Sequence, residues 1–414
     1  MSPRDLAHDP PPDLSPSPAE APPHRVPALW LLVAMTGIGP FTMQIMIPSL
    51  PLIARDLGVS YGVAQLTLAL YLAGVALGQL LYGPLSDRFG RRPVLLAGLG
   101  LFVVASALAS AAAGIVTLTL ARVAQAVGAC TGMVLGRAII RDVWPREQAA
   151  SRMGYVVMGM TIAPMVAPML GAVLENHFGW RATMIACLLG GLPVILATWH
   201  RLPETLKEPQ PLPGLRGMLE AYLSLLRLSA FRWIAGVNAA SIGCFFAFMS
   251  GAPLVSEAMG KTPRDYATAF LCISVSFACG SWIAGRYSSR LGTARMLWTG
   301  LRIGVVGAVA MLAIQLLLPH TLLGFFLPMA VIALGNGISM PNAVAAAVSV
   351  RPERAGTASG LLGATQMGVG ALLTVLTGAL EGGAGIATAI VMVACGTAAI
   401  LALRRVPLAT VGGG

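Results

Sequence analysis

Arg122 is the residue of this sequence with the clearest capacity for chemistry. It is the only charged residue between Arg92 and Arg137, so a helix through this run carries one isolated positive charge. At 1.5 Å per residue, Arg122 lies roughly 12 Å from the nearer end of that helix, and Gln44 and Tyr71 lie about 14–15 Å deep in two earlier helices. These side chains could bind a ligand or relay a proton. The structural alternative is an arginine satisfied by backbone carbonyls.

The other reactive residue types give no second site. The five His show no metal-ligand spacing, and the six Cys lie singly in apolar stretches without a CxxC pair. No phosphate loop or nucleotide motif occurs. We therefore expect no metal, no cofactor, and an ion gradient as the energy source.

The elements that must position Arg122 follow from the composition. Of the 414 residues, 56% are hydrophobic and 10% are charged, and the mean hydropathy is +0.78. A soluble domain carries about 25% charged residues, so a soluble enzyme and a disordered chain are excluded. The net charge of +11 comes from basic residues scattered between apolar stretches, which argues against a nucleic-acid partner. The sequence predicts an all-α polytopic membrane protein.

Uncharged runs long enough to cross a bilayer, which takes about 20 residues, occur twelve times. They are Arg25–Arg55, Asp56–Asp87, two runs within Arg92–Arg137 broken near Ser110–Gly114, Arg152–Glu175, Arg181–Arg201, Arg232–Glu257, Asp265–Arg286, two runs within Arg302–Arg351 turned at Pro319–His320, Arg354–Glu381 and Glu381–Arg404. We expect two six-helix halves, 28–200 and 231–403, between a Pro-rich tail (1–27) and a C-terminal tail (404–414). The linker 201–230 contains an amphipathic segment, Leu215–Ala230, which would lie on the membrane surface.

The basic residues predict the orientation. Of the 27 Lys and Arg residues, all but five lie in the two tails or in the loops on the same side of the membrane as the tails. The exceptions are Arg122 within a span and Arg55, Arg181, Lys261 and Arg264 on the opposite side. Because basic segments stay in the cytoplasm, we expect both termini to be cytoplasmic.

The loop after the second span carries a distinctive motif. Residues 83–92 read GPLSDRFGRR, in which Gly90 permits a tight turn and Asp87 interrupts the basic pattern. This loop resembles the GxLaDrxGrr marker of the major facilitator superfamily, whose fold has two pseudo-symmetric six-helix halves. The resemblance implies a cytoplasmic latch that stabilises the outward-open state. Its residues would be Gly83, Asp87, Arg88, Gly90, Arg91 and Arg92, with Arg137 and Arg141 nearby.

Further motifs resemble the Bcr/CflA-type multidrug-efflux branch of the twelve-span drug:proton antiporters. They are Ile47–Pro51 (IPSLP), Gln65–Tyr71 (QLTLALY), Arg122–Gly128 (RVAQAVG), Gly335–Gly337 and Pro341–Ala343. The resemblance covers about residues 28–403 and implies proton relay or substrate contact by Arg122. The chain departs from this branch in a residue that bears on proton coupling. The branch has an Asp where this chain has Gln44, and no predicted span carries an Asp or Glu at mid-depth. Glu257 or Arg122 could take over that role.

The fifth span carries small residues and prolines at fourfold spacing. They are Gly159, Ala163-Pro164, Ala167-Pro168 and Gly171. The pattern is similar to the antiporter motif that shapes the hinge between the halves in exporters, in a variant with Ala163 in place of Gly. The alternative is ordinary close packing of small residues.

The expected substrate and proton pathway comprises eight residues of both halves. They are Gln44, Tyr71, Arg122, Gln125, Phe245, Phe246, Asn336 and Gln366. For the members of the second half, hydrogen bonding or packing between helices explains the residue types equally well.

The sequence thus predicts a monomeric inner (plasma) membrane exporter of small amphipathic drugs or metabolites, working by alternating access and proton antiport. Its partners would be a small-molecule substrate, protons and the lipid bilayer. One alternative is an exporter of a sugar or purine-like metabolite. From other classes, an integral membrane enzyme would need a clustered His/Asp or Ser/His site, and a sensor would need an output domain.

Overall fold

The computed structural model describes residues 27–206, 208–209, 214–351 and 354–406, and these residues form helices and turns without a β-strand. The predicted tails fall largely outside them, since residues 1–26 and 407–414 are not described.

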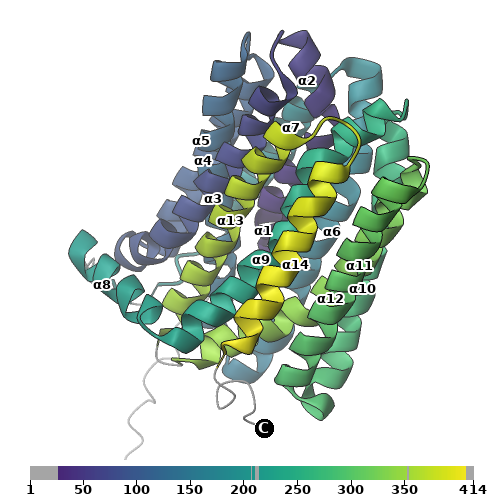
Figure 1. Ribbon diagram of the computed structural model, residues 1–414. Helices are drawn as coiled ribbons and strands as arrows, with labels where there is room; N and C mark the ends of the chain where they lie inside the picture. Colours follow the sequence, from purple (N-terminus) through teal and green to yellow (C-terminus); the bar gives the residue numbers. More distant parts are fainter. Residues whose placement is uncertain (1–26, 207, 210–213, 352–353, 407–414) are drawn as a thin grey trace, which may run out of the picture.

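Twelve long helices form the bundle (Figure 1). The first half consists of α1 (Leu29–Ile45) continued by η1 (Ile47–Ser49) and α2 (Leu50–Asp56), α3 (Tyr61–Phe89), α4 (Arg91–Ser110), α5 (Ile115–Val143), α6 (Arg146–Phe178) and α7 (Arg181–Arg201). The second half consists of α9 (Ser229–Ala258), α10 (Pro263–Leu291), α11 (Thr293–Leu317), α12 (Leu322–Ser349), α13 (Ala355–Leu380) and α14 (Ile386–Arg404). Eleven of the twelve are long and apolar enough to cross a membrane, and the remaining one, α6, has 33 residues. The predicted all-α, twelve-helix architecture is confirmed.

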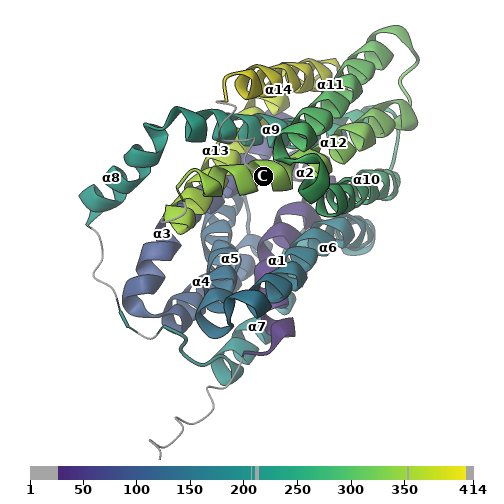
Figure 2. The same ribbon diagram turned by 90° about the horizontal axis from the view of Figure 1, so that it is seen from below.

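The two halves of the chain lie side by side. Seen from one end of the bundle in Figure 2, α1–α7 occupy one side and α9–α14 the other. Within the first half α1 packs on α5 and α6, and within the second half α12 packs on α10 and α11. Between the halves, α3 lies along α13 and α6 contacts α10.

The bundle is apolar on its surface and closely packed inside. On α5, Val116 and Leu120 are 69% and 67% exposed, a cost in water that disappears in lipid. On the inner face of the same helix, a Cβ at Gly128 would clash with the backbone of Phe102 on α4. Glycine at this position therefore permits the close approach of two helix backbones that is typical of membrane bundles.

The linker helix α8 spans Leu215–Leu226 and is shorter than predicted. The backbone is extended at Leu228, and α9 begins at Ser229, so residues 229–230 belong to the next span. The Tyr222 hydroxyl donates to the backbone carbonyl of Leu80 at 2.8 Å. Figure 1 shows the rest of α8 reaching away from the bundle, near the end at which α14 finishes.

The opposite end of the bundle, which contains Arg55 and Glu257, is called the outer end below because the arginine distribution predicts that it faces outward. Here the halves are joined by the ion pair between Arg55 on α2 and Glu257 on α9. The Tyr61 hydroxyl and Gln65 Nε2 on α3 also donate to the Ser250 carbonyl on α9, at 2.7 and 2.6 Å. Polar contacts therefore close the seam between the halves at this end.

Candidate transport site

Arg122 lies inside the first half with its side chain fully buried. Its Nη1 donates to the Thr42 carbonyl at 3.2 Å and to Oε1 of Gln125 at 2.5 Å. The guanidinium carbon lies 4.3 Å from the centroid of the Tyr71 ring, an arrangement in which the ring face stabilises the cation. The Tyr71 hydroxyl in turn donates to the Gly39 carbonyl at 3.0 Å. The structure thus brings Tyr71 on α3 and two residues of α5 together beside α1.

The hydrogen-bond chain continues to a residue that the sequence did not suggest. Gln125 Nε2 donates to the Ser106 hydroxyl at 2.8 Å, and that hydroxyl donates to the Phe102 carbonyl of its own helix at 2.7 Å. A serine inside an apolar span gives no sequence pattern, because it can satisfy itself on its own helix. Only the packing of α4 on α5 reveals its role in orienting Gln125.

Arg122 and Gln44 both carry buried polar atoms that have no partner in the described part of the chain. Among the described residues, nothing accepts a hydrogen bond from Nε or Nη2 of Arg122, and Oε1 of Gln44, itself 1% exposed, has no donor. The ion pairs of the described residues do not include Arg122. A buried charge without a counter-ion is costly, so this site is chemically suited to bind a hydrogen-bond acceptor or an anionic group.

Three of the expected pathway residues of the second half contact residues of their own half. Asn336 on α12 donates through Nδ2 to the Ser241 carbonyl on α9 at 3.0 Å, which matches the alternative of hydrogen bonding between helices. The Phe245 and Phe246 rings meet edge to face, with centroids 5.8 Å apart, and a Cβ at Gly370 on α13 would clash with Phe246. Both phenylalanines therefore have packing partners within their own half.

Gln366 lies closer to the first half. It is half-buried on α13, and its neighbour Met367 packs against the cluster that contains Tyr71 and Val75 of α3. Of the pathway residues expected in the second half, Gln366 thus lies on a helix segment that packs close to Tyr71 of the first half.

The loop that carries the predicted cytoplasmic latch is organised around Arg91. Its side chain pairs with Asp87 at 2.5 Å and with Asp142 on α5 at 2.9 Å, and it donates to the Ser86 hydroxyl at 2.6 Å. Gly90 has a φ of +98°, a conformation that a side chain would strain. The motif therefore forms a compact turn that ties α3 and α4 to α5.

Glu204, after the sixth span, completes this turn. Its carboxylate accepts hydrogen bonds from the backbone N–H groups of Arg91 and Arg92 at 2.9 and 3.1 Å. An acid at the N-terminus of α4 satisfies free N–H groups and opposes the positive end of the helix dipole. The sequence did not indicate Glu204, since its partners are more than a hundred residues away.

The other basic residues of the predicted latch point elsewhere in this conformation. Arg92 donates to the Trp199 carbonyl at 2.7 Å, and Arg137 Nε donates to the Met133 carbonyl of its own helix at 3.0 Å. Arg88 and Arg141 are exposed. Gly83 lies within α3, with open space where a Cβ would be.

The small residues of α6 face α1 in the same half. A Cβ at Gly159 would clash with Val33, and one at Gly171 would clash with the Ile45 carbonyl. Pro164 and Pro168 lie between them within the same helix. These glycines thus serve close packing within the first half, while α6 contacts α10 of the second half.

Comparison with known proteins assigns the family. The model of the Major Facilitator Superfamily matches residues 32–375, most of the chain. The chain belongs to this superfamily. Its fold is shared with solved transporters, including a D-xylose-proton symporter that has a TM-score of 0.73 and 17% identity, over 92% of this chain and 98% of that one.

Relatives named for drug resistance support the Bcr/CflA-type branch. The chain is 34% identical to a chloramphenicol resistance protein of Pseudomonas aeruginosa, over 76% of this chain and 72% of the relative. It is 29% identical to multidrug resistance protein D of Escherichia coli, over 83% and 86% of the two chains. It is 28% identical to a bicyclomycin resistance protein homolog of Haemophilus influenzae, over 84% and 87%. The superfamily member described here is thus a Bcr/CflA-type transporter.

Proposed function

We propose that this transporter exports small amphipathic compounds across the inner membrane by alternating access, driven by proton antiport. The observation that carries this proposal is the buried Arg122, because two of its N–H-bearing nitrogens have no partner within the described ranges and can hold an acceptor group of the substrate. The Tyr71 ring and its apolar neighbours are buried beside Arg122 in this conformation. They would face the rest of an amphipathic molecule once the halves rock apart.

The closed outer seam is one of the two states that alternating access requires. With Arg55 and Glu257 paired and Gln65 bonded to α9, this conformation would take substrate from the cytoplasmic side. Rocking of the halves would then open the outer end and release it.

The test uses a host that lacks its own drug exporters. Expression of the wild-type chain should raise resistance to chloramphenicol, and Arg122→Ala should remove that resistance while the protein still reaches the membrane. Arg216→Ala, in an exposed pair on α8, is the matched control and should behave like wild type. In inverted vesicles, drug uptake should stop when an uncoupler collapses the proton gradient. Full resistance in Arg122→Ala, or uptake without a gradient, would contradict the proposal.

A further inference from the structure

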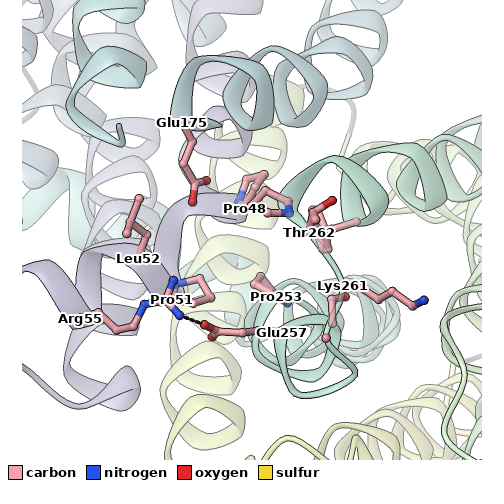
Figure 3. A pocket seen from close by; sticks show the side chains of 13 residues that line it. Pro48, Pro51, Leu52, Arg55, Glu175, Pro253, Glu257, Lys261 and Thr262 are labelled. Atoms are coloured by element: carbon pink, nitrogen blue, oxygen red, sulfur yellow. Dashed lines mark hydrogen bonds and ion pairs between the residues drawn. The ribbon is translucent and has the colours of Figure 1, made fainter. Parts of the chain in front are cut away.

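A cavity of about 270 Å³ lies at the outer end of the seam (Figure 3), and the described residues that line it do not include Arg122 or Tyr71. Its apolar walls are Pro48, Pro51 and Leu52 from the first half and Pro253 and Pro263 from the second half. Pockets for drug-sized ligands have volumes of about 300–1,000 Å³, so this cavity suits a smaller molecule. Because its walls come from both halves, the cavity requires the outer end to be closed.

The charges around the cavity leave one carboxylate available. Arg55 and Glu257 are paired with each other, and Figure 3 shows the ammonium group of Lys261 directed away from them. Glu175 accepts a hydrogen bond from the buried Ser49 hydroxyl at 2.8 Å. Among the described residues no Arg or Lys lies within ion-pairing distance of Glu175. Of the two acidic and two basic residues that line the cavity, Glu175 is thus the acid that has no ion-pair partner among the described residues and can pair with a cation.

Two hydroxyl groups in the same wall have no partner. Ser256 and Tyr266 line the cavity, are 2% and 1% exposed, and make no hydrogen bond within the described part of the chain. Buried hydroxyls are nearly always satisfied, because leaving one unpaired is costly. Their lone pairs could accept N–H groups of a molecule held by Glu175.

We propose that this cavity is a binding site for a primary alkylammonium ion that enters from the outer side. The ammonium group would pair with Glu175 and donate to the hydroxyls of Ser256 and Tyr266, and the alkyl chain would lie on the prolines. This site goes beyond the proposed export function, since its ligand comes from the opposite side of the membrane. A ligand that contacts both halves favours the conformation in which they meet, so the bound amine holds the outer end closed.

The experiment measures binding to the full chain in lipid nanodiscs. Butylammonium chloride is titrated while the midpoint of thermal unfolding is followed, and the midpoint should rise with saturation in the wild-type protein. Glu175→Gln should weaken the apparent affinity at least about tenfold, because a charge-assisted hydrogen bond is lost. Tyr266→Phe, which keeps the ring, should weaken it severalfold. Glu220→Gln, a carboxylate on the exposed face of α8, should bind like wild type.

Two comparisons make the result decisive. Tetramethylammonium, which has no N–H group, and sodium chloride at equal ionic strength should not reproduce the saturable rise. Arg122→Ala should retain butylammonium binding, which separates this site from the export site and from the outcome of the export test. Absence of saturation in the wild type, equal affinity in Glu175→Gln, or an equal effect of tetramethylammonium or sodium overturns the proposal.

Discussion

At the scale of single residues, the candidate site is defined by a buried cation, Arg122, that forms no ion pair with any residue the structure describes. Arg122 makes hydrogen bonds to one backbone carbonyl and one amide oxygen, and two of its nitrogens stay unpaired among the described residues. At a few Å in a low-dielectric interior, like charges repel by several kcal/mol. We therefore expect a permanently cationic drug to be a poor substrate and a neutral or weakly anionic amphiphile to be a good one.

Replacing Gln44 by Asp tests this selectivity. Gln44→Asp places a carboxylate two residues from Thr42, whose carbonyl accepts a hydrogen bond from Arg122. We expect export of a quaternary cation to rise and export of chloramphenicol to fall, each by about tenfold, which corresponds to ~1.4 kcal/mol. Efflux of both compounds is measured side by side. Wild-type export of the cation that survives in Arg122→Ala would argue against this role of the charge.

Asp87 offers a second test at this scale. In Asp87→Asn the Arg91 side chain keeps Asp142 and Ser86 as partners, and Asp87 is partly exposed. The loss of stability should therefore stay within about 1 kcal/mol. Export should nevertheless fall by about tenfold if Asp87 biases the equilibrium between two access states. Thermal unfolding and efflux are compared with those of the α8 control Glu220→Gln. Unchanged efflux would make Asp87 an ordinary loop charge.

The sequence indicated some of the residues around the candidate site and missed others. The depths of Arg122 and Tyr71 followed from counting 1.5 Å per residue, because a spanning helix has a fixed rise. Ser106 and Glu204 could not be found in this way, since each acts on a residue of another helix that only tertiary packing brings near. The partner of Asn336 was likewise unpredictable, because its contact depends on how α12 crosses α9.

At the scale of elements, α3 and α13 form the longest contact between the halves. Near the cytoplasmic end, a Cβ at Gly363 would clash with the side-chain amide of Gln79, and toward the outer end one at Gly378 would meet Gln65 at 2.8 Å. Each glutamine thus occupies a notch that a glycine of the other half provides. In the proposed rocking motion, such a seam would keep the two helices in contact.

Gly363→Ala should disturb this seam. The added methyl group overpacks the notch, which typically costs 1–3 kcal/mol, so we expect a lower unfolding midpoint and slower export. Gly368→Ala on the same helix is the matched control, because a Cβ there meets open space and alanine favours the helix. Both variants are measured by thermal unfolding and efflux. Identical behaviour of the two would show that the notch has no part in transport.

At the scale of the whole molecule, the sequence predicted the number of helices because the charges at their ends mark the spans. The turns at Ala111–Gly114 and at Leu318–Thr321 fall where the long uncharged runs were divided. The shorter α8 was not predicted in detail. Its amphipathic pattern continues into residues that the fold assigns to α9.

The orientation of the bundle is testable with reporter fusions. Reporters placed after Arg92, Pro209 and Arg405 should report the cytoplasm, and one near Lys261 should report the outside, because of the strong asymmetry of basic residues. The paired reporters are an enzyme active only in the cytoplasm and one active only outside. An external signal at Pro209 would require a different topology.

The outer ion pair links this transporter to the salinity of its surroundings. The side chains of Arg55 and Glu257 are 66% and 34% exposed, and such pairs contribute up to about 1 kcal/mol, or roughly a fivefold change in a two-state equilibrium. Dissolved salt shortens the range of their attraction to about 8 Å at physiological strength and about 3 Å at 1 M. A rise in ionic strength at this end should therefore shift the balance between the two halves toward a more open outer end, without any change in the protein.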